Sequence, residues 1–144
     1  MPHLVVDLDP PADAPVSFSM DTAPLVYFLS FAHAARYGSQ HELTKAALLM
    51  RGGEHKLDLK PLLTFADRDA EEPIDKRDLE RAWQDAAPLA ECCQAVVAAI
   101  DADAAIREQL AESPTLRDLL EELGRIVADV AAEGRRVRLT YVMD

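Results

Sequence analysis

The sequence contains few cysteines and few glycines, and it lacks long hydrophobic runs. Its 144 residues include two cysteines and five glycines. Cys92 and Cys93 are adjacent, and a disulfide between neighbours in a helix would be badly strained, so we expect free thiols. No apolar run approaches the roughly 18 residues of a transmembrane helix, and residues 1–20 have neither the basic start nor the apolar core of a signal peptide. These absences predict a cytoplasmic protein.

Basic residues are also scarce. The chain has 15 lysines and arginines against 26 aspartates and glutamates, which gives a formal net charge of -11 at pH 7. A negative field repels phosphate backbones and anionic lipid surfaces, so we expect neither nucleic-acid nor membrane binding. The charge leaves a basic protein partner open, although an acidic surface also serves simply to keep a small domain soluble.

No complete motif for catalysis, a cofactor or a metal is present. The glycines fit neither phosphate-binding fingerprint, and no serine nucleophile elbow occurs. Lys45 stands four residues after His41, where the zinc-protease helix motif requires a second histidine. The other histidines, His3, His33 and His55, fall on different predicted elements. The sequence therefore predicts no cofactor and no metal, and it favours a non-catalytic protein over an enzyme.

Residues 4–9 form an apolar run that ends in Asp-x-Asp, at Asp7 and Asp9. This run resembles the first motif of the haloacid dehalogenase-type phosphotransferases. The resemblance implies a nucleophile at Asp7 and an acid/base at Asp9 beside magnesium. It covers only these residues, and Pro10 and Pro11 replace the small and hydroxylated residues of that family. The chain also lacks the alternating strands and helices of a parallel sheet, so we favour a strand whose end turns into solvent.

Composition and length favour one folded domain over residues 1–144, with a proline-rich linker inside it at residues 10–15. Hydrophobic residues make up 49% of the chain and charged residues 28%, which is ordinary for a soluble globular domain. A chain of this size can bury about 70% of the surface that it exposes when unfolded. No disulfide or metal is needed for folding.

Two segments carry the wide apolar stripe of a helix packed into a globular bundle. The first stripe is Leu79, Ala82, Trp83, Ala86, Leu89, Ala90, Cys93, Val96, Val97 and Ile100, and the second is Leu116, Leu119, Leu120, Leu123, Ile126, Val127 and Val130. We predict one helix over residues 76–100, kinked at Pro88, and a second that opens at Ser113 and Pro114 and ends at Gly134. Small residues dominate the first stripe and bulky ones the second, which favours an antiparallel pair, with a short helix around Ile106 bridging their ends.

The remaining elements are shorter. Asp21 or Thr22 can cap a helix that ends at Gly38, and Ser39 with Glu42 has the capping-box form for a helix through Met50. Residues 54–73 predict a short strand or turn and then a short helix. Residues 3–9, 16–20 and 135–144 alternate as strands do, and the last needs a partner in one of the other two or in another subunit.

Together these elements predict a predominantly α-helical α+β fold. It comprises a bundle of about five helices and a small two- or three-stranded sheet formed near the N- and C-termini.

Two groups of side chains are candidates for ligand or partner contact. Arg135, Arg136 and Arg138 form a basic cluster in an acidic chain, and they could clamp an anion or an acidic partner. They are also explained by a helix dipole and by protection of a strand edge, which is the stronger interpretation. The second group, Tyr27, His33 and Tyr37, places polar tips on an apolar helix.

These candidates lead to two hypotheses for function. The preferred one is a non-catalytic binding or assembly protein that acts by protein-protein contact, with strand edges and wide apolar stripes favouring a homodimer. Trp83 and Tyr141 then serve as core or interface anchors. The alternative is a small-molecule binder or small enzyme with a pocket between the striped helices and the helix that bears Tyr27, His33 and Tyr37.

Overall fold

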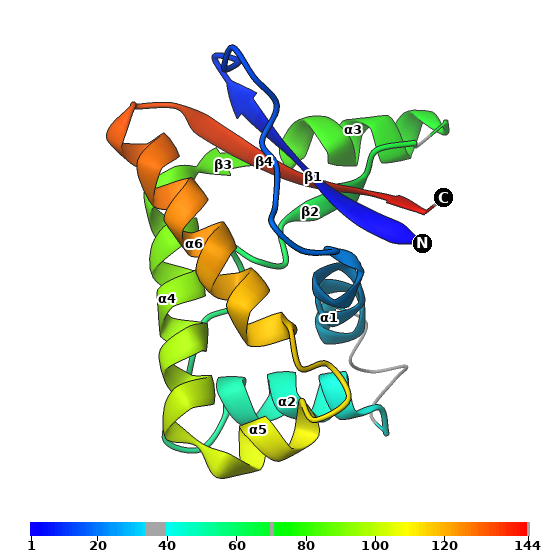
Figure 1. Cartoon of the computed structure of the whole chain (residues 1–144). Helices are drawn as coiled ribbons and strands as arrows, with labels where there is room; N and C mark the ends of the chain where they lie inside the picture. Colours follow the sequence, from blue (N-terminus) through cyan, green and yellow to red (C-terminus); the bar gives the residue numbers. More distant parts are fainter. Residues whose placement is uncertain (34–39, 70, 144) are drawn as a thin grey trace.

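The computed structural model describes residues 1–33, 40–69 and 71–143, and within them it has the predicted α+β fold (Figure 1). The helices are α1 (Ala23–His33), α2 (Glu42–Arg51), α3 (Pro73–Arg81), α4 (Ala86–Ala102), α5 (Ala104–Gln109) and α6 (Leu116–Ala132). The strands are β1 (Pro2–Asp9), β2 (Phe65–Asp67), β3 (Trp83–Asp85) and β4 (Arg136–Met143). The described part thus has six helices and four strands, slightly more elements than the sequence predicts.

Strand β4 is the centre of a mixed sheet. On one side it pairs along its whole length with antiparallel β1, from Pro2 opposite Met143 to Asp9 opposite Arg136. On its other side it pairs with parallel β2 and antiparallel β3. The C-terminal strand therefore takes its partner from residues 3–9, one of the three candidates. Residues 16–20 are not a strand, so that prediction is wrong; the Ser19 amide and hydroxyl bond instead to Glu122 on α6.

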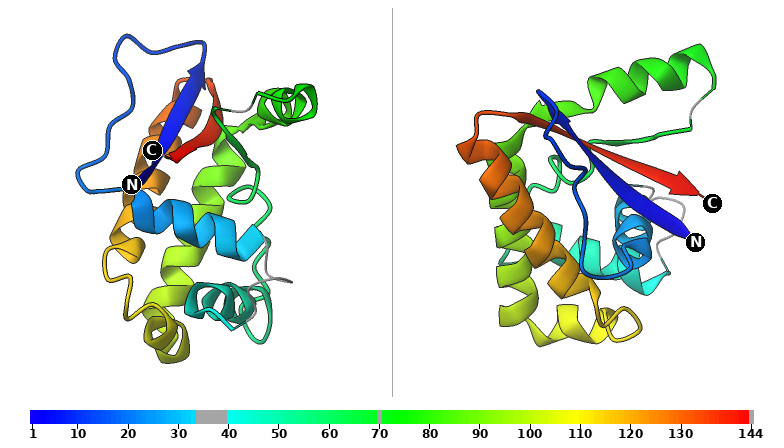
Figure 2. Two further views of the ribbon diagram at one scale, coloured as in Figure 1. Left: turned by 90° about the vertical axis from the view of Figure 1, so that its right-hand side faces the viewer. Right: turned by 45° about the horizontal axis from the view of Figure 1, so that its top comes forward.

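Alternation along β1 and β4 gives the sheet an apolar face and a polar face. Leu4, Val6, Val137 and Leu139 are buried in one contiguous core with residues of α1, α2, α4 and α6. Helices α1, α4 and α6 lie on this side of the sheet (Figure 2). The intervening residues of both strands face away from the helices, and these carry most of the strands' charges.

Helices α4 and α6 form the predicted antiparallel pair, joined through the short α5 (Figure 1). Gly124 on α6 lies so close to α4 that an added Cβ would be 3.1 Å from the Cβ of Cys93. Gly134 follows α6 with a φ of 72°, as the sequence predicts for a left-handed residue that ends a helix.

The single kinked helix predicted over residues 76–100 is wrong. The chain forms α3, leaves the helical path to pair residues 83–85 with β4, and starts again as α4 with Asp85 at its N-cap. Pro88 consequently lies in the first turn of α4, where a backbone N–H has no intrahelical acceptor and proline costs little. The spacing of the apolar residues is the same on both sides of the break, which is why the sequence pattern resembles that of one continuous helix.

Two helix starts also differ from the prediction. Helix α2 is capped by His41, whose Nδ1 accepts a hydrogen bond from the Leu43 amide, and the predicted cap Ser39 and stop Gly38 lie outside the described residues. Helix α6 begins at Leu116, because the Leu116 amide bonds to the Ser113 carbonyl in a turn that precedes the helix. Of the two predicted caps of α1, Asp21 makes the side-chain bond, since its carboxylate accepts from the Ala23 amide, whereas Oγ1 of Thr22 accepts from the Leu4 amide.

The weakly patterned residues 54–73 contain β2 and turns rather than the predicted short helix. Leu59 and Leu62 are fully buried, so this irregular segment still contributes to the core. Cys92 and Cys93 are free, as predicted. Cys92 is buried against the Asp58 carbonyl, and burial raises the pKa of both thiols.

Candidate binding site beside strand β1

Strand β1 is an edge of the sheet, and part of its outer edge is open. The Leu4 amide donates to Oγ1 of Thr22 over 2.9 Å, so the main-chain groups of Leu4 point away from β4. Main-chain groups alternate between the two edges of a strand, and those of Val6 and Leu8 therefore point the same way. Among the described residues, no hydrogen bond reaches Val6 or Leu8 from this side.

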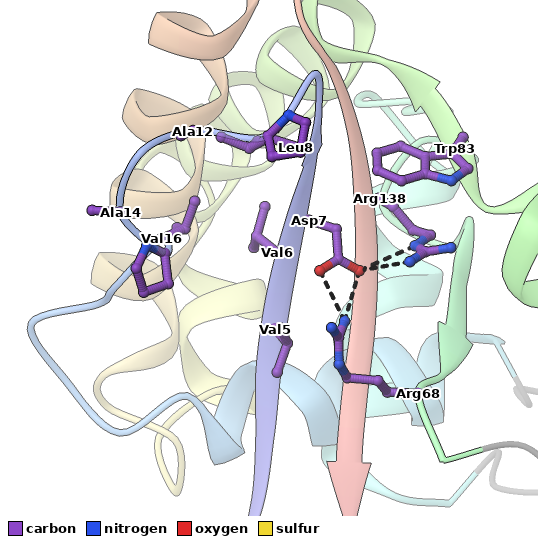
Figure 3. A pocket seen from close by; sticks show the side chains of 12 residues that line it. Val5, Val6, Asp7, Leu8, Ala12, Ala14, Val16, Arg68, Trp83 and Arg138 are labelled. Carbon is purple, nitrogen blue, oxygen red and sulfur yellow. Dashed lines mark hydrogen bonds and ion pairs between the residues drawn. The ribbon is translucent and has the colours of Figure 1, made fainter.

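A hollow of about 390 Å³ lies beside this open stretch (Figure 3). We call it the β1 hollow. It is lined by residues 5–8 of β1, by residues 11, 12 and 14–16 of the following loop, and by Arg68, Trp83 and Arg138. Most of its lining is apolar, and its charged lining residues are Asp7, Arg68 and Arg138. This combination of a predominantly apolar wall and a few placed polar groups is typical of ligand sites.

The loop that forms one wall of the β1 hollow is anchored at both ends. At its start, Nη1 of Arg135 donates to the carbonyls of Pro10 and Pro11, over 2.5 and 2.7 Å. At its end, the Ser19 amide and hydroxyl donate to the Glu122 carboxylate, over 3.0 and 2.7 Å. These bonds hold the intervening residues away from β1. The proline-rich segment predicted as a linker is thus a fixed wall of the hollow.

Asp7 lies between two guanidinium groups in the β1 hollow (Figure 3). Nη1 of Arg68 donates to both of its carboxylate oxygens, over 2.9 and 2.7 Å. Arg138, its direct neighbour across the β1–β4 ladder, approaches the same carboxylate through Nε at 3.1 Å and Nη2 at 3.0 Å. The Asp7 side chain is only 19% exposed. Asp7 is therefore a structural ion-pair partner within the strand and does not turn into solvent.

The dehalogenase-type interpretation of Asp7 and Asp9 does not fit this arrangement. Both residues lie on an edge strand that is antiparallel to its one neighbour, whereas that family requires a parallel sheet. Asp9 faces Arg136 at 3.7 Å on the exposed end of the ladder. Among the described residues, no group of three or more histidine, cysteine, aspartate or glutamate side chains is placed to hold a metal ion.

The three arginines predicted as a contact cluster lie around one end of the sheet, and each has an acidic partner. Arg135 pairs with Glu133 at 2.6 Å while it anchors the loop. Arg136 and Arg138 stack on the ring of Trp83, with their Cζ atoms 5.8 and 4.6 Å from its centroid. Trp83 thus anchors two cations beside the hollow, and of the three arginines only Arg138 lines it.

Arg68 is a member of this site that sequence reasoning missed. Its amide donates to the Tyr141 carbonyl over 3.0 Å, so its backbone is fixed against β4 directly after β2. Its side chain crosses Thr140 to reach Asp7. Nothing near Arg68 in the sequence marks it, because its position depends on a three-residue strand without a clear alternating pattern.

The structure describes two of the three candidates expected to line a pocket between α1 and the α4–α6 pair, His33 and Tyr27. His33 lines a different hollow of about 280 Å³, together with Phe65 and Tyr141, whose rings contact one another edge to face. We call it the His33 hollow; its other lining residues are Ala66, Asp67, Asp75 and Asp78. Tyr27 is 40% exposed elsewhere on α1, and Tyr37 lies outside the described residues.

Negative charge dominates the His33 hollow. Burial raises the pKa of the Tyr141 phenol, and the nearby carboxylates of Asp67 and Asp75 raise it further. In the described part of the chain, these two carboxylates and that of Asp78 form no ion pair. The two hollows therefore differ in charge. Arginines outnumber the one aspartate in the β1 hollow, whereas aspartates line the His33 hollow.

Comparison of the chain with protein-family models, curated proteins and solved structures gives no match. Among the described residues, no helix is both long and apolar enough to cross a membrane. The case for a function therefore rests on the geometry of the sites themselves.

Proposed function

We propose that this protein is a non-catalytic binding protein that holds an extended segment of a partner protein alongside β1. The observation that carries the proposal is the open edge at Val6 and Leu8, which faces a hollow with a fixed far wall. An extended segment placed there gains main-chain hydrogen bonds from the edge and side-chain contacts from the apolar wall. Strand addition of this kind satisfies backbone groups that the fold leaves to solvent.

The shape of the site favours a single segment over the edge of a second copy. Residues 11–16 stand beside the same edge that a second β1 would need, and the second copy would bring its own loop to that place. A lone strand needs only the space between loop and edge. The homodimer remains a hypothesis, and the experiment below distinguishes it from binding of a segment.

The chemistry of the β1 hollow favours binding over catalysis. The described residues that line it include no histidine, cysteine, serine or lysine. The three charged groups bond to one another, because Asp7 accepts from both Arg68 and Arg138. A carboxylate held in this way serves to position the two guanidiniums.

The test begins with selection of peptides from a random library displayed on phage, followed by calorimetry on the enriched peptides. We expect Ala14→Trp, which adds a bulky indole to the loop wall of the β1 hollow, to weaken binding at least tenfold. Ala105→Trp, at an exposed position of α5, is the matched control and should bind like the wild type. Enriched peptides that bind the Ala14→Trp variant equally well, or a selection that enriches nothing, would contradict the proposal.

Hydrogen exchange locates the bound segment on the strand. We expect the amides of Val6 and Leu8 to exchange more slowly in the complex, because the added strand accepts their hydrogen bonds. The Leu4 amide, already bonded to Thr22, should change little. Sedimentation of the free protein tests whether a second copy of the chain occupies the edge instead. A stable dimer whose Val6 and Leu8 amides are already protected from exchange would assign the edge to that second copy.

A second candidate function, binding of a small organic cation, is favoured by the His33 hollow. Its aromatic rings, and its carboxylates, which form no ion pair with the residues that the structure describes, suit a quaternary ammonium group. We expect titration with tetramethylammonium to shift the ring resonances of Phe65 and Tyr141, and Asp75→Asn with Asp78→Asn to reduce the effect. Equal shifts in that double variant would argue against a cation site.

A further inference from the structure

We infer that the segment bound in the β1 hollow carries an acidic side chain, and that Arg68 is the residue that binds it. This inference rests on the proposed function, and it names the chemistry of the partner. It follows from which guanidinium donors the fold already uses, from the charge balance of the hollow, and from the direction of side chains on an added strand.

Two nitrogens of the Arg68 guanidinium are unused by the described residues, whereas each of the three nitrogens of Arg138 already has a partner. A guanidinium carries five N–H donors, and every hydrogen bond from Arg68 to Asp7 and Thr140 comes from Nη1. Its Nε and Nη2 donate to no described residue, and its side chain is 39% exposed. Arg138 is 14% exposed and uses Nε and Nη2 on Asp7 and Nη1 on the Leu79 carbonyl, while its Cζ stacks on Trp83.

The charge balance of the hollow favours one incoming carboxylate. Two arginines and one aspartate line it, which leaves one positive charge uncompensated by the lining, and the nearby Glu80 lies on the Arg138 side, 3.9 Å from its Nη1. The Nε and Nη2 donors of a guanidinium match the two oxygens of a carboxylate in a bidentate pair. Because the whole protein carries a net charge of -11, a strongly acidic segment would be repelled. The fitting segment therefore has one acidic residue and is otherwise neutral or basic.

The sheet geometry places that acidic residue. Side chains of an added strand alternate between the two faces of the sheet, and every second one lies on the same face as Val5 and Asp7. Arg68 reaches Asp7 across this face. An acidic side chain on that face lies next to Asp7 and meets the free side of the Arg68 guanidinium. Its neighbours along the segment point the other way.

The experiment is a double-mutant cycle on the complex found by peptide selection. We expect the enriched peptides to share a glutamate or aspartate at one position. Replacing it by the isosteric amide should weaken binding to the wild type about tenfold, as expected for loss of a charge-assisted hydrogen bond. Arg68→Gln should weaken binding of the acidic peptide by a similar factor and leave binding of the amide peptide unaffected. Arg125→Gln, at an exposed position of α6, is the matched control.

The outcomes separate the inference from the proposed function. Peptides that bind in the β1 hollow without an acidic residue, or that bind the wild type and Arg68→Gln equally, would overturn the role of Arg68 and leave strand addition standing. A selection that yields no binder overturns both. Circular dichroism of the Arg68→Gln variant establishes that it is folded, so that a loss of binding reports the missing guanidinium.

Discussion

At the scale of single residues, the ladder between β1 and β4 contains two ion pairs of similar composition and different setting. Asp7 pairs with Arg138 and Arg68, with the Asp7 and Arg138 side chains only 19% and 14% exposed. Asp9 pairs with Arg136 at 3.7 Å, and both side chains are about half exposed. Water screens the second pair and screens the first far less, so the two pairs should differ in their contribution to stability.

We predict that Asp7→Asn lowers the free energy of unfolding by about 1–2 kcal/mol, because the largely buried Arg138 guanidinium then has no described acidic partner closer than Glu80, 3.9 Å away. Asp9→Asn should change it by no more than about 0.5 kcal/mol, as exposed pairs contribute little. Urea unfolding at neutral pH measures both. Equal effects of the two substitutions would contradict the assignment of Asp7 as the central partner of the arginines.

At the scale of elements, the contact between α4 and α6 is set by a glycine. Gly124 lies in the middle of α6, where alanine would favour the helix by about 1 kcal/mol. A Cβ there would be 3.1 Å from the Cβ of the fully buried Cys93, and neither helix can move away without disturbing the core. The close approach of the helices therefore opposes the intrinsic preference of the sequence.

We predict that Gly124→Ala lowers the free energy of unfolding by about 1 kcal/mol, since overpacking outweighs the gain in helix propensity. The cost should shrink in a Cys93→Gly background, where the opposing Cβ is absent. Denaturant titration of the two single variants and the double variant gives this coupling. A Gly124→Ala variant that is more stable than the wild type would show that the helices are not in close contact here.

At the scale of the whole molecule, one ion pair connects distant parts of the helical layer. Nε2 of His55, in the turn after α2, lies 2.8 Å from Oδ2 of Asp103, which also caps α5 through the Ala105 amide. The hydrogen bond from His55 is the main cause that lowers the pKa of Asp103, and the cap bond to Ala105 adds to it. Helices α2 and α5 pack against each other at this point.

This lowered pKa makes part of the stability depend on pH. Because the pKa of Asp103 is lower in the folded protein than its usual unfolded value of about 3.9, its contribution is fully present above that value. It is lost as the pH falls through the folded pKa. We predict that the stability advantage of the wild type over Asp103→Asn shrinks as the pH falls through the folded pKa of Asp103 and disappears in acid.

Thermal unfolding between neutral pH and about pH 2.5 measures this difference. Asparagine still caps a helix, so the comparison isolates the charge of Asp103. Asp13→Asn, on the exposed loop, is the control. A difference that does not depend on pH would show that the ion pair with His55 contributes nothing.

Local patterns in the sequence are sufficient to predict the fold class, the antiparallel α4–α6 pair, the strands at the two termini and the free thiols. Each of these follows from a local pattern, such as the apolar stripe of Leu116 to Val130 or the alternation of Val137 and Leu139, because the period of apolar residues reports the element that buries them.

Local patterns do not predict where β2 and β3 form, which acids meet which arginines, or that Arg68 belongs to the candidate site. These features follow from the packing of the folded chain. Residues 83–85 leave the helical path because β4 offers main-chain partners, and Asp7 meets Arg68 from 61 positions away. Such contacts depend on which backbones the core brings side by side, and no local pattern encodes them. The open edge of β1 is likewise a property of the assembled sheet. Because β4 pairs with one side of β1, the opposite side becomes the free edge.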